Sequence, residues 1–110
     1  MPKVSEVRPN KWSNIKDLYD DNEYSAIWGD YNGDKGKLGV RWNGGQNFGF
    51  PHQGKYSLWY IEPVYLVRNI LIELLYKVNQ NNESGNIKNI LQALKEFNEN
   101  NKLEDKTKNE

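Results

Sequence analysis

The chain has 110 residues with 15 Lys+Arg, 15 Asp+Glu, one His and no Cys, a length that suits one domain with one main core. The lack of cysteine excludes a disulfide framework, a thiolate metal site and a cysteine nucleophile. Residues 1–62 carry eight basic and eight acidic side chains and residues 63–110 carry seven of each, so neither half has the basic patch that duplex binding requires.

Aromatic residues and glycines are concentrated in one part of the chain. Residues 1–60 hold 11 of the 14 aromatics and eight of the nine glycines, whereas the remainder is rich in Leu, Ile, Asn, Lys and Glu. This division predicts a single α+β domain over residues 1–101, with a β-rich part at 23–62 and a helical part at 63–101. Residues 102–110 are nearly all polar and are predicted to form a flexible charged tail.

The N-terminal segment, Met1–Asn22, is interrupted by charge or proline every few positions. It lacks the apolar run of a secretory signal, so we expect a cytoplasmic protein. Within it, a short helix is predicted over Ser13–Tyr19. That prediction rests on apolar side chains at three- and four-residue spacing: Trp12, Ile15, Leu18 and Tyr19.

The β-rich part contains short apolar runs separated by turn residues. Four strands are predicted, at Tyr24–Asp30, Lys37–Asn43, Asn47–Phe50 and Tyr56–Ile61. Asn32-Gly33 and Asn43-Gly44-Gly45 supply residues that tolerate the positive φ of tight hairpins. In the second strand Leu38, Val40 and Trp42 share one face. An antiparallel meander of three to four strands is therefore expected, and an SH3-like barrel with C-terminal helices is the alternative.

Two packed α-helices are predicted to follow the sheet. The first begins after Pro63 and runs to Asn79, and it is apolar nearly all round, so we expect burial on more than one side. A homodimer through the Pro63–Asn79 helix would provide such burial, and a monomer whose helix is covered by the sheet and the second helix is the alternative. The second helix is capped by Ser84 or Asn86. The most apolar stretch of the chain, Val64–Val78, is too short and too charged to span a membrane, so no membrane association is expected.

One turn resembles a calcium loop in part. Asp30-Tyr31-Asn32-Gly33-Asp34 reproduces the D-x-N-x-D opening, which groups oxygen ligands on one side of a turn. The pattern then breaks, because Lys35 replaces the usual glycine and Arg41 replaces the bidentate glutamate. We therefore interpret Asp30–Asp34 as a polar hairpin turn and predict no metal site, although weak cation binding stays open.

His52, in the Pro51–Gly54 loop, is the first candidate for acid–base chemistry, since it alone titrates near neutral pH without perturbation. No nucleophile is evident beside it. No catalytic residue and no cofactor are therefore predicted, and a small enzyme or inhibitor centred on His52 is kept as an alternative.

The β-rich part holds more aromatics than a small sheet can bury, so some are expected on a surface. Exposed Trp and Tyr anchor protein partners or stack on single-stranded bases, and the even charge favours proteins. The predicted binding residues are Trp28, Arg41, Trp42, Asn43, His52, Gln53 and Trp59.

No motif in the chain points to a known family. The expected function is a non-catalytic interaction module that presents this surface to a protein partner or small ligand. A single-stranded nucleic-acid binder is the alternative. The composition is typical of small proteins encoded by phages and other mobile elements.

Overall fold

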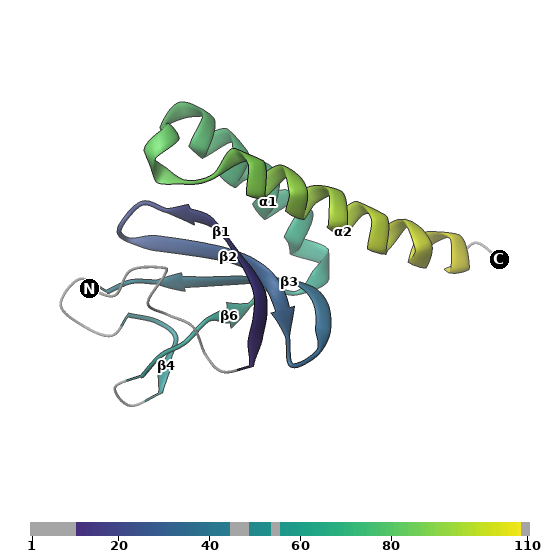
Figure 1. Ribbon diagram of the computed structural model, residues 1–110, viewed down its shortest axis with the longest axis horizontal. Helices are drawn as coiled ribbons and strands as arrows, with labels where there is room; N and C mark the ends of the chain where they lie inside the picture. The colour runs from purple at the N-terminus through teal and green to yellow at the C-terminus, as the bar shows by residue number, and fades with distance from the viewer. Residues whose placement is uncertain (1–10, 45–48, 54–55, 109–110) are drawn as a thin grey trace.

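The computed structural model describes residues 11–44, 49–53 and 56–108, with the side chains of 52–53, 56–57 and 102–108 outside the description. Its main feature is a four-stranded antiparallel sheet in the order β1-β2-β3-β6, followed by two helices (Figure 1). The elements are β1 (Trp12–Asp20), β2 (Tyr24–Tyr31), β3 (Asp34–Trp42), β4 (His52–Gln53), β5 (Tyr56–Ser57), β6 (Tyr60–Ile61), α1 (Val64–Gln80), η2 (Asn82–Ser84) and α2 (Ile87–Lys108). The predicted α+β fold is confirmed, and the sheet does not close into a barrel.

The β2–β3 hairpin forms where the sequence predicts it. Asn32 and Gly33 both have positive φ, at 52° and 89°, as a tight turn between two strands requires. Just beyond the turn, the pairing shifts by one residue between Gly29 and Tyr31. From there on the register places Tyr24 opposite Trp42.

The predicted helix at Ser13–Tyr19 is wrong, because these residues lie in strand β1. β1 pairs with β2 through two register shifts, each of which inserts one extra residue into β1. Asn14, in the first shift, has a φ of 52°. An extra residue turns the two-residue spacing of a strand into three, so Trp12 and Ile15 reach the same apolar cluster and imitate a helical pattern.

The region after β3 differs in detail from the prediction. Of the predicted Asn47–Phe50 strand, residues 47–48 lie outside the description, and Phe50 makes a single antiparallel bridge to Trp42. The predicted Tyr56–Ile61 strand is divided into β5, which pairs with β4, and β6, which pairs with β3. Between them Leu58 donates its N–H to the Pro51 carbonyl oxygen.

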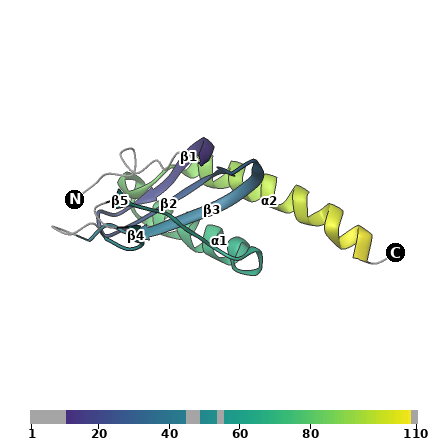
Figure 2. The same cartoon turned by 90° about the horizontal axis from the view of Figure 1, so that it is seen from below.

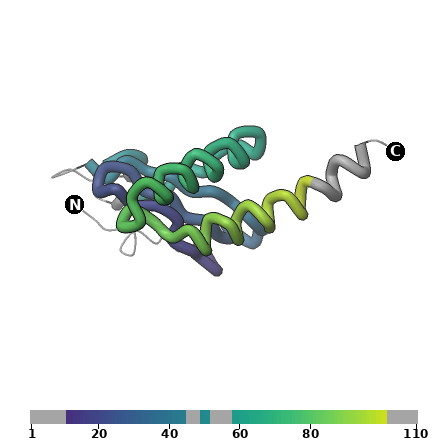
Figure 3. Tube along the Cα trace, turned by 90° about the horizontal axis from the view of Figure 1, so that it is seen from above, coloured from purple at the N-terminus to yellow at the C-terminus, as the bar shows by residue number. Residues whose placement is uncertain are grey.

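Both faces of the sheet are covered. Helices α1 and α2 lie against one face, as views from opposite sides show (Figures 2 and 3). The main core lies between them and the sheet, around Leu18, Leu38, Leu71 and Ile90. On the other face a smaller cluster is formed by Trp12, Ile27 and Trp59.

Helix α1 buries one stripe, made of Val67, Leu71, Leu74 and Val78. Its opposite side is exposed in this chain, with Tyr65, Ile72 and Tyr76 pointing outward. The second burial surface predicted for this helix is therefore not provided by the residues that the structure describes, and the homodimer stays a prediction.

Helix α2 begins at an asparagine cap. The Asn86 side-chain oxygen accepts the N–H of Asn89 at 3.1 Å, which selects Asn86 from the two predicted caps. The backbone of α2 continues helical to Lys108 and extends past the sheet (Figure 1). The flexibility expected of residues 102–110 stays a prediction. Across the described residues, neither helix combines the length and the hydropathy needed to cross a bilayer.

Candidate functional site

A row of aromatic rings lies across the sheet at the end of β3. Tyr24 of β2 is the cross-strand partner of Trp42, and Trp42 in turn faces Phe50. Two backbone hydrogen bonds, from the N–H of each residue to the carbonyl oxygen of the other, join Trp42 and Phe50 at 2.7 and 2.8 Å. Since cross-strand partners project to the same face of a sheet, the three rings share one face.

A fourth ring completes the group. Tyr60 of β6 lies opposite Val40, which precedes Trp42 by two residues and therefore shares its face. These side chains border a cleft of about 300 Å³, here called the aromatic cleft. It is lined by Tyr24, Val40, Arg41, Trp42, Phe50, Pro51, Tyr60 and Glu62.

Three of the four rings of the aromatic cleft are largely open to solvent, and Tyr24 is half-buried. Trp42 is 55 % exposed, Phe50 63 % and Tyr60 50 %. Tyr24 and Trp42 contact each other edge to face, with ring centroids 4.9 Å apart and ring planes at 63°, so their rings form a corner. A group of exposed rings held in fixed positions is typical of an interaction surface.

Glu62 adds a carboxylate to this apolar wall. Its backbone N–H donates to the Leu38 carbonyl oxygen at 2.9 Å, which places it directly after β6. Burial raises the pKa of the Glu62 carboxyl, and burial together with the charge of Glu62 raises the pKa of Tyr24 to about 12. Within the part of the chain that the structure describes, the Glu62 carboxylate has neither a hydrogen bond nor an ion pair.

Arg41 supports the cleft from the other face of the sheet. It is 1 % exposed, and its guanidinium donates to the carbonyl oxygens of Leu58 at 2.7 Å and Trp42 at 3.2 Å and to the Asn43 side chain at 3.2 Å. Asn43 then donates to the Ser25 hydroxyl at 2.7 Å. Burial lowers the pKa of Arg41. This buried network ties the chain after β3 to the sheet and fixes the position of Trp42.

Gly49 allows the chain to pass close to this network. Its φ is +77°, and a Cβ at this position would overlap the Trp42 carbonyl oxygen and the Arg41 guanidinium. Only glycine suits both the conformation and the space. The Phe50 wall of the cleft therefore depends on a glycine that directly precedes it.

The predicted binding residues do not share one surface. Trp42 is exposed in the cleft, whereas Arg41 and Asn43 are buried beneath it. Trp28 is buried on the helix face, where its indole N–H donates to Glu96 at 2.7 Å, and Trp59 is buried on the opposite face. His52 and Gln53 form β4, and their side chains lie outside the described part.

Sequence reasoning missed Tyr24, Phe50, Tyr60 and Glu62 as parts of one site. Tyr24 and Tyr60 do fall at strand ends in the predicted meander, which is a weak signal. Their proximity to Trp42 follows from the strand register, which the hydrophobic alternation does not specify to the residue.

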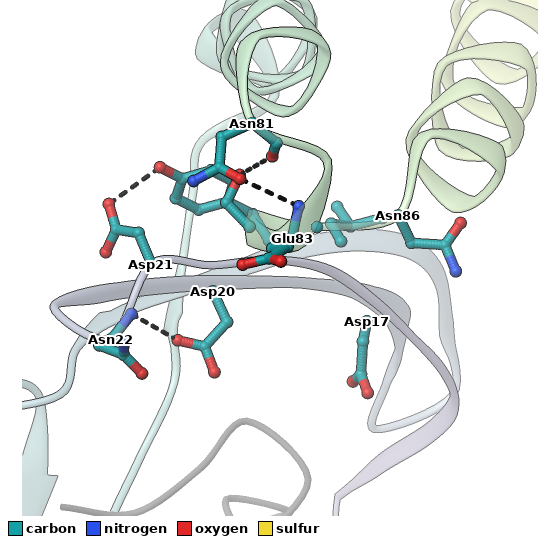
Figure 4. A pocket seen from close by; sticks show the side chains of 11 residues that line it. Asp17, Asp20, Asp21, Asn22, Asn81, Glu83 and Asn86 are labelled. Carbon is teal, nitrogen blue, oxygen red and sulfur yellow. Dashed lines mark hydrogen bonds between the residues drawn. The ribbon is translucent and has the colours of Figure 1, made fainter.

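A second, larger cleft of about 520 Å³ lies between the β1–β2 turn and the α1–α2 connection (Figure 4). Four carboxylates line it, from Asp17, Asp20, Asp21 and Glu83, and we call it the acidic cleft. The Asp21 carboxylate accepts the Tyr19 hydroxyl at 2.9 Å and the N–H of Tyr24 at 2.8 Å. Asp20 accepts the N–H of Asn22. These acceptors stabilise the turn itself.

The partial calcium loop serves a structural purpose. The Asp30 carboxylate accepts the N–H of Gly36 and the ammonium of Lys35, both at 3.1 Å, and the Asn14 side chain at 2.9 Å. It thereby holds the extra residue of β3 that shifts the β2–β3 register. Among the side chains that the structure describes, no group of three or more acids or histidines is arranged to hold a metal ion.

Comparisons of the chain with protein-family models, with curated proteins and with solved structures give no match. The geometry of the two clefts is therefore the basis for a functional proposal.

Proposed function

We propose that the protein is a non-catalytic binding module whose aromatic cleft receives a segment of a protein partner. The observation that supports this proposal is the group of exposed rings, Trp42, Phe50 and Tyr60, held by strand pairing around a cleft. Aromatic side chains on a rigid scaffold bury large areas at little entropic cost when a partner binds, and they dominate many interfaces.

The charges of the cleft favour a protein over a nucleic acid. Among its lining residues Arg41 is the single cation, and its guanidinium is bonded to carbonyl oxygens on the other face of the sheet. Glu62 would repel phosphates. A single-stranded binder needs a cationic groove beside its stacking rings. The nucleic-acid alternative therefore requires a cationic groove, which these lining residues do not provide.

Selection of peptides from a displayed random library tests the proposal. Peptides enriched on the wild-type protein should share a motif, and Trp42→Ala or Phe50→Ala should weaken their binding by about tenfold or more in calorimetry. Tyr76→Ala, which removes an exposed ring from α1, is the matched control and should leave binding unchanged. Circular dichroism verifies that each variant is folded.

Two outcomes would contradict the proposal. Equal binding by wild type and Trp42→Ala would place the contact elsewhere. Tight binding of a single-stranded oligonucleotide at low salt, lost in Trp42→Ala, would favour the nucleic-acid alternative.

The alternative centred on His52 predicts that His52→Ala removes an activity that Trp42→Ala retains.

The oligomeric state and location are further proposals. The outward stripe of α1, with Tyr65, Ile72 and Tyr76, is the surface through which a homodimer would form. Sedimentation at twice the chain mass of 12.9 kDa would support it. A cytoplasmic location, and a gene carried by a phage or other mobile element, rest on the sequence alone.

A further inference from the structure

We propose that the aromatic cleft recognises an arginine side chain of the protein partner, with the guanidinium placed against the rings and paired with Glu62. This inference rests on the proposed function and specifies the chemistry of the bound segment.

The negative charge of Glu62 favours a cationic ligand in the cleft. The Glu62 carboxylate lies at the wall of an apolar cleft without a hydrogen bond or ion pair among the described residues. Partial burial without a partner is unfavourable for an ionised carboxylate. A ligand that supplies a positive hydrogen-bond donor would remove this cost.

The rings offer faces for a cation. The ring planes of Tyr24 and Trp42 meet at 63°. Tyr60 is the cross-strand partner of Val40 and lies on the same face of the sheet as these two rings. A cation within about 6 Å of a ring centroid is attracted by the negative face of the ring, most strongly for tryptophan. The rings and the carboxylate thus attract the same kind of group from different sides.

The guanidinium matches this cleft better than an ammonium does. It is planar, so it can stack on a ring while its N–H groups form two parallel bonds to a carboxylate. It is also more weakly hydrated than the lysine ammonium, so it loses less on entering an apolar site. A volume of about 300 Å³ is at the small end of ligand pockets, which suits one side chain.

Arg41 does not already play this role. Its side chain projects to the face opposite Trp42, where its guanidinium bonds the Leu58 and Trp42 carbonyl oxygens and the Asn43 side chain. The carboxylate of Glu62 and the ring faces on the helix side of the sheet are left for a ligand.

Titration with short peptides, followed by the NMR signal of the Trp42 indole N–H, tests the inference. The probes are acetyl-Gly-Gly-X-Gly-Gly-amide peptides in which X is arginine, lysine, trimethyllysine or citrulline, the uncharged isostere of arginine. Trp42→Phe identifies the signal. The arginine peptide should bind about fivefold or more tighter than the citrulline peptide, because charge and bidentate pairing both contribute.

Glu62→Gln provides the second readout. It should reduce the affinity for the arginine peptide by about fivefold or more and leave the citrulline peptide unchanged. Glu73→Gln, which removes an exposed carboxylate from α1, is the matched control and should change neither affinity.

Each contrary outcome has a distinct meaning. Equal binding of arginine and citrulline peptides would overturn the cationic recognition while leaving the proposed function intact. Tighter binding of lysine or trimethyllysine would overturn the choice of guanidinium. If no probe binds while library-selected peptides do, the inference fails alone; if the arginine peptide binds but no peptide is enriched, the proposed function fails.

Discussion

The two clefts differ in how fully their polar groups are satisfied. The acidic cleft is the larger, at about 520 Å³, but the carboxylates of Asp20 and Asp21 accept hydrogen bonds within their own turn. The aromatic cleft, at about 300 Å³, holds exposed rings and the Glu62 carboxylate, which has no hydrogen bond or ion pair among the described residues. The exposed rings and the carboxylate that accepts no hydrogen bond among the described residues, and not cavity size, are the reason for proposing the aromatic cleft as the binding site.

The largest expected effect is at Arg41, whose network supports the aromatic cleft. Arg41→Met should lower the free energy of unfolding by about 4 kcal/mol, because it removes the guanidinium donor from the Leu58 carbonyl, from the Asn43 side chain and from the Trp42 carbonyl, which keeps the Phe50 N–H. Urea denaturation measures this loss. Arg68→Met is the matched control. Since Arg68 is exposed and contacts Asn98 and Phe97 at the surface, Arg68→Met should lower the free energy of unfolding by less than about 1 kcal/mol.

Equal losses for the two arginine variants would show that the buried network does not support the cleft. Trp42 would then not depend on Arg41 for its position, and the aromatic cleft would lack the buried support that distinguishes it from the acidic cleft.

A smaller effect is expected at Gly49, beside the Phe50 wall. Gly49→Ala should cost about 3 kcal/mol, since both its positive φ and the overlap with the Trp42 carbonyl must be relieved. Gly33→Ala separates the two causes. Gly33 also has a positive φ but open space around it, so about 1 kcal/mol is expected. Thermal unfolding measures the stability loss of both variants. A larger loss for Gly33→Ala than for Gly49→Ala would refute the close approach at Gly49.

The smallest effect is expected in the acidic cleft, as a pH dependence. Burial alone would raise the pKa of Asp21, but hydrogen bonds from the N–H of Tyr24, the Tyr19 hydroxyl and the N–H of Glu23 outweigh it, so the pKa is lowered from 3.8. A lowered pKa in the folded state contributes stability above pH 3.8 that is lost as the pH falls through the folded value.

Urea denaturation between pH 6 and pH 2.5 reveals this contribution. Asp21→Asn should show a weaker decline in stability toward acid than the wild type, whereas Asp34→Asn, at the exposed first residue of β3, should follow the wild type. An identical decline in all three would mean that Asp21 does not stabilise its turn, and the acidic cleft would then become a candidate binding site.

Much of the fold could be predicted from local patterns. The β2–β3 hairpin follows from Asn32-Gly33 between alternating strands, and α1 follows from Pro63 and apolar residues at three- and four-residue steps. β1 could not be predicted in this way. Its first bulge alters the spacing of Trp12 and Ile15, and a bulge depends on pairing with a partner strand.

The candidate site was predicted only in part. An excess of aromatics over what a small sheet can bury indicates that some are exposed, and Trp42 is one of them. The sequence does not show that Trp28 and Trp59 are buried on opposite faces, because each lies in an apolar pattern compatible with either environment. Burial of Arg41 contradicts the usual preference of a charged side chain and requires acceptors brought by distant segments.

The sequence alone determined which segments are strands and helices over most of the chain, since alternation, helical spacing and turn residues are local properties. The tertiary structure decided the register. Tyr31 pairs with Asp34 at the turn, and continuing that register would place Tyr24 opposite Arg41. The extra residue held by Asp30 places it opposite Trp42 instead. Because a one-residue shift exchanges the faces of paired side chains, this bulge brings Tyr24 onto the face of Trp42, whereas Phe50 and Tyr60 reach that face through their own pairing with β3.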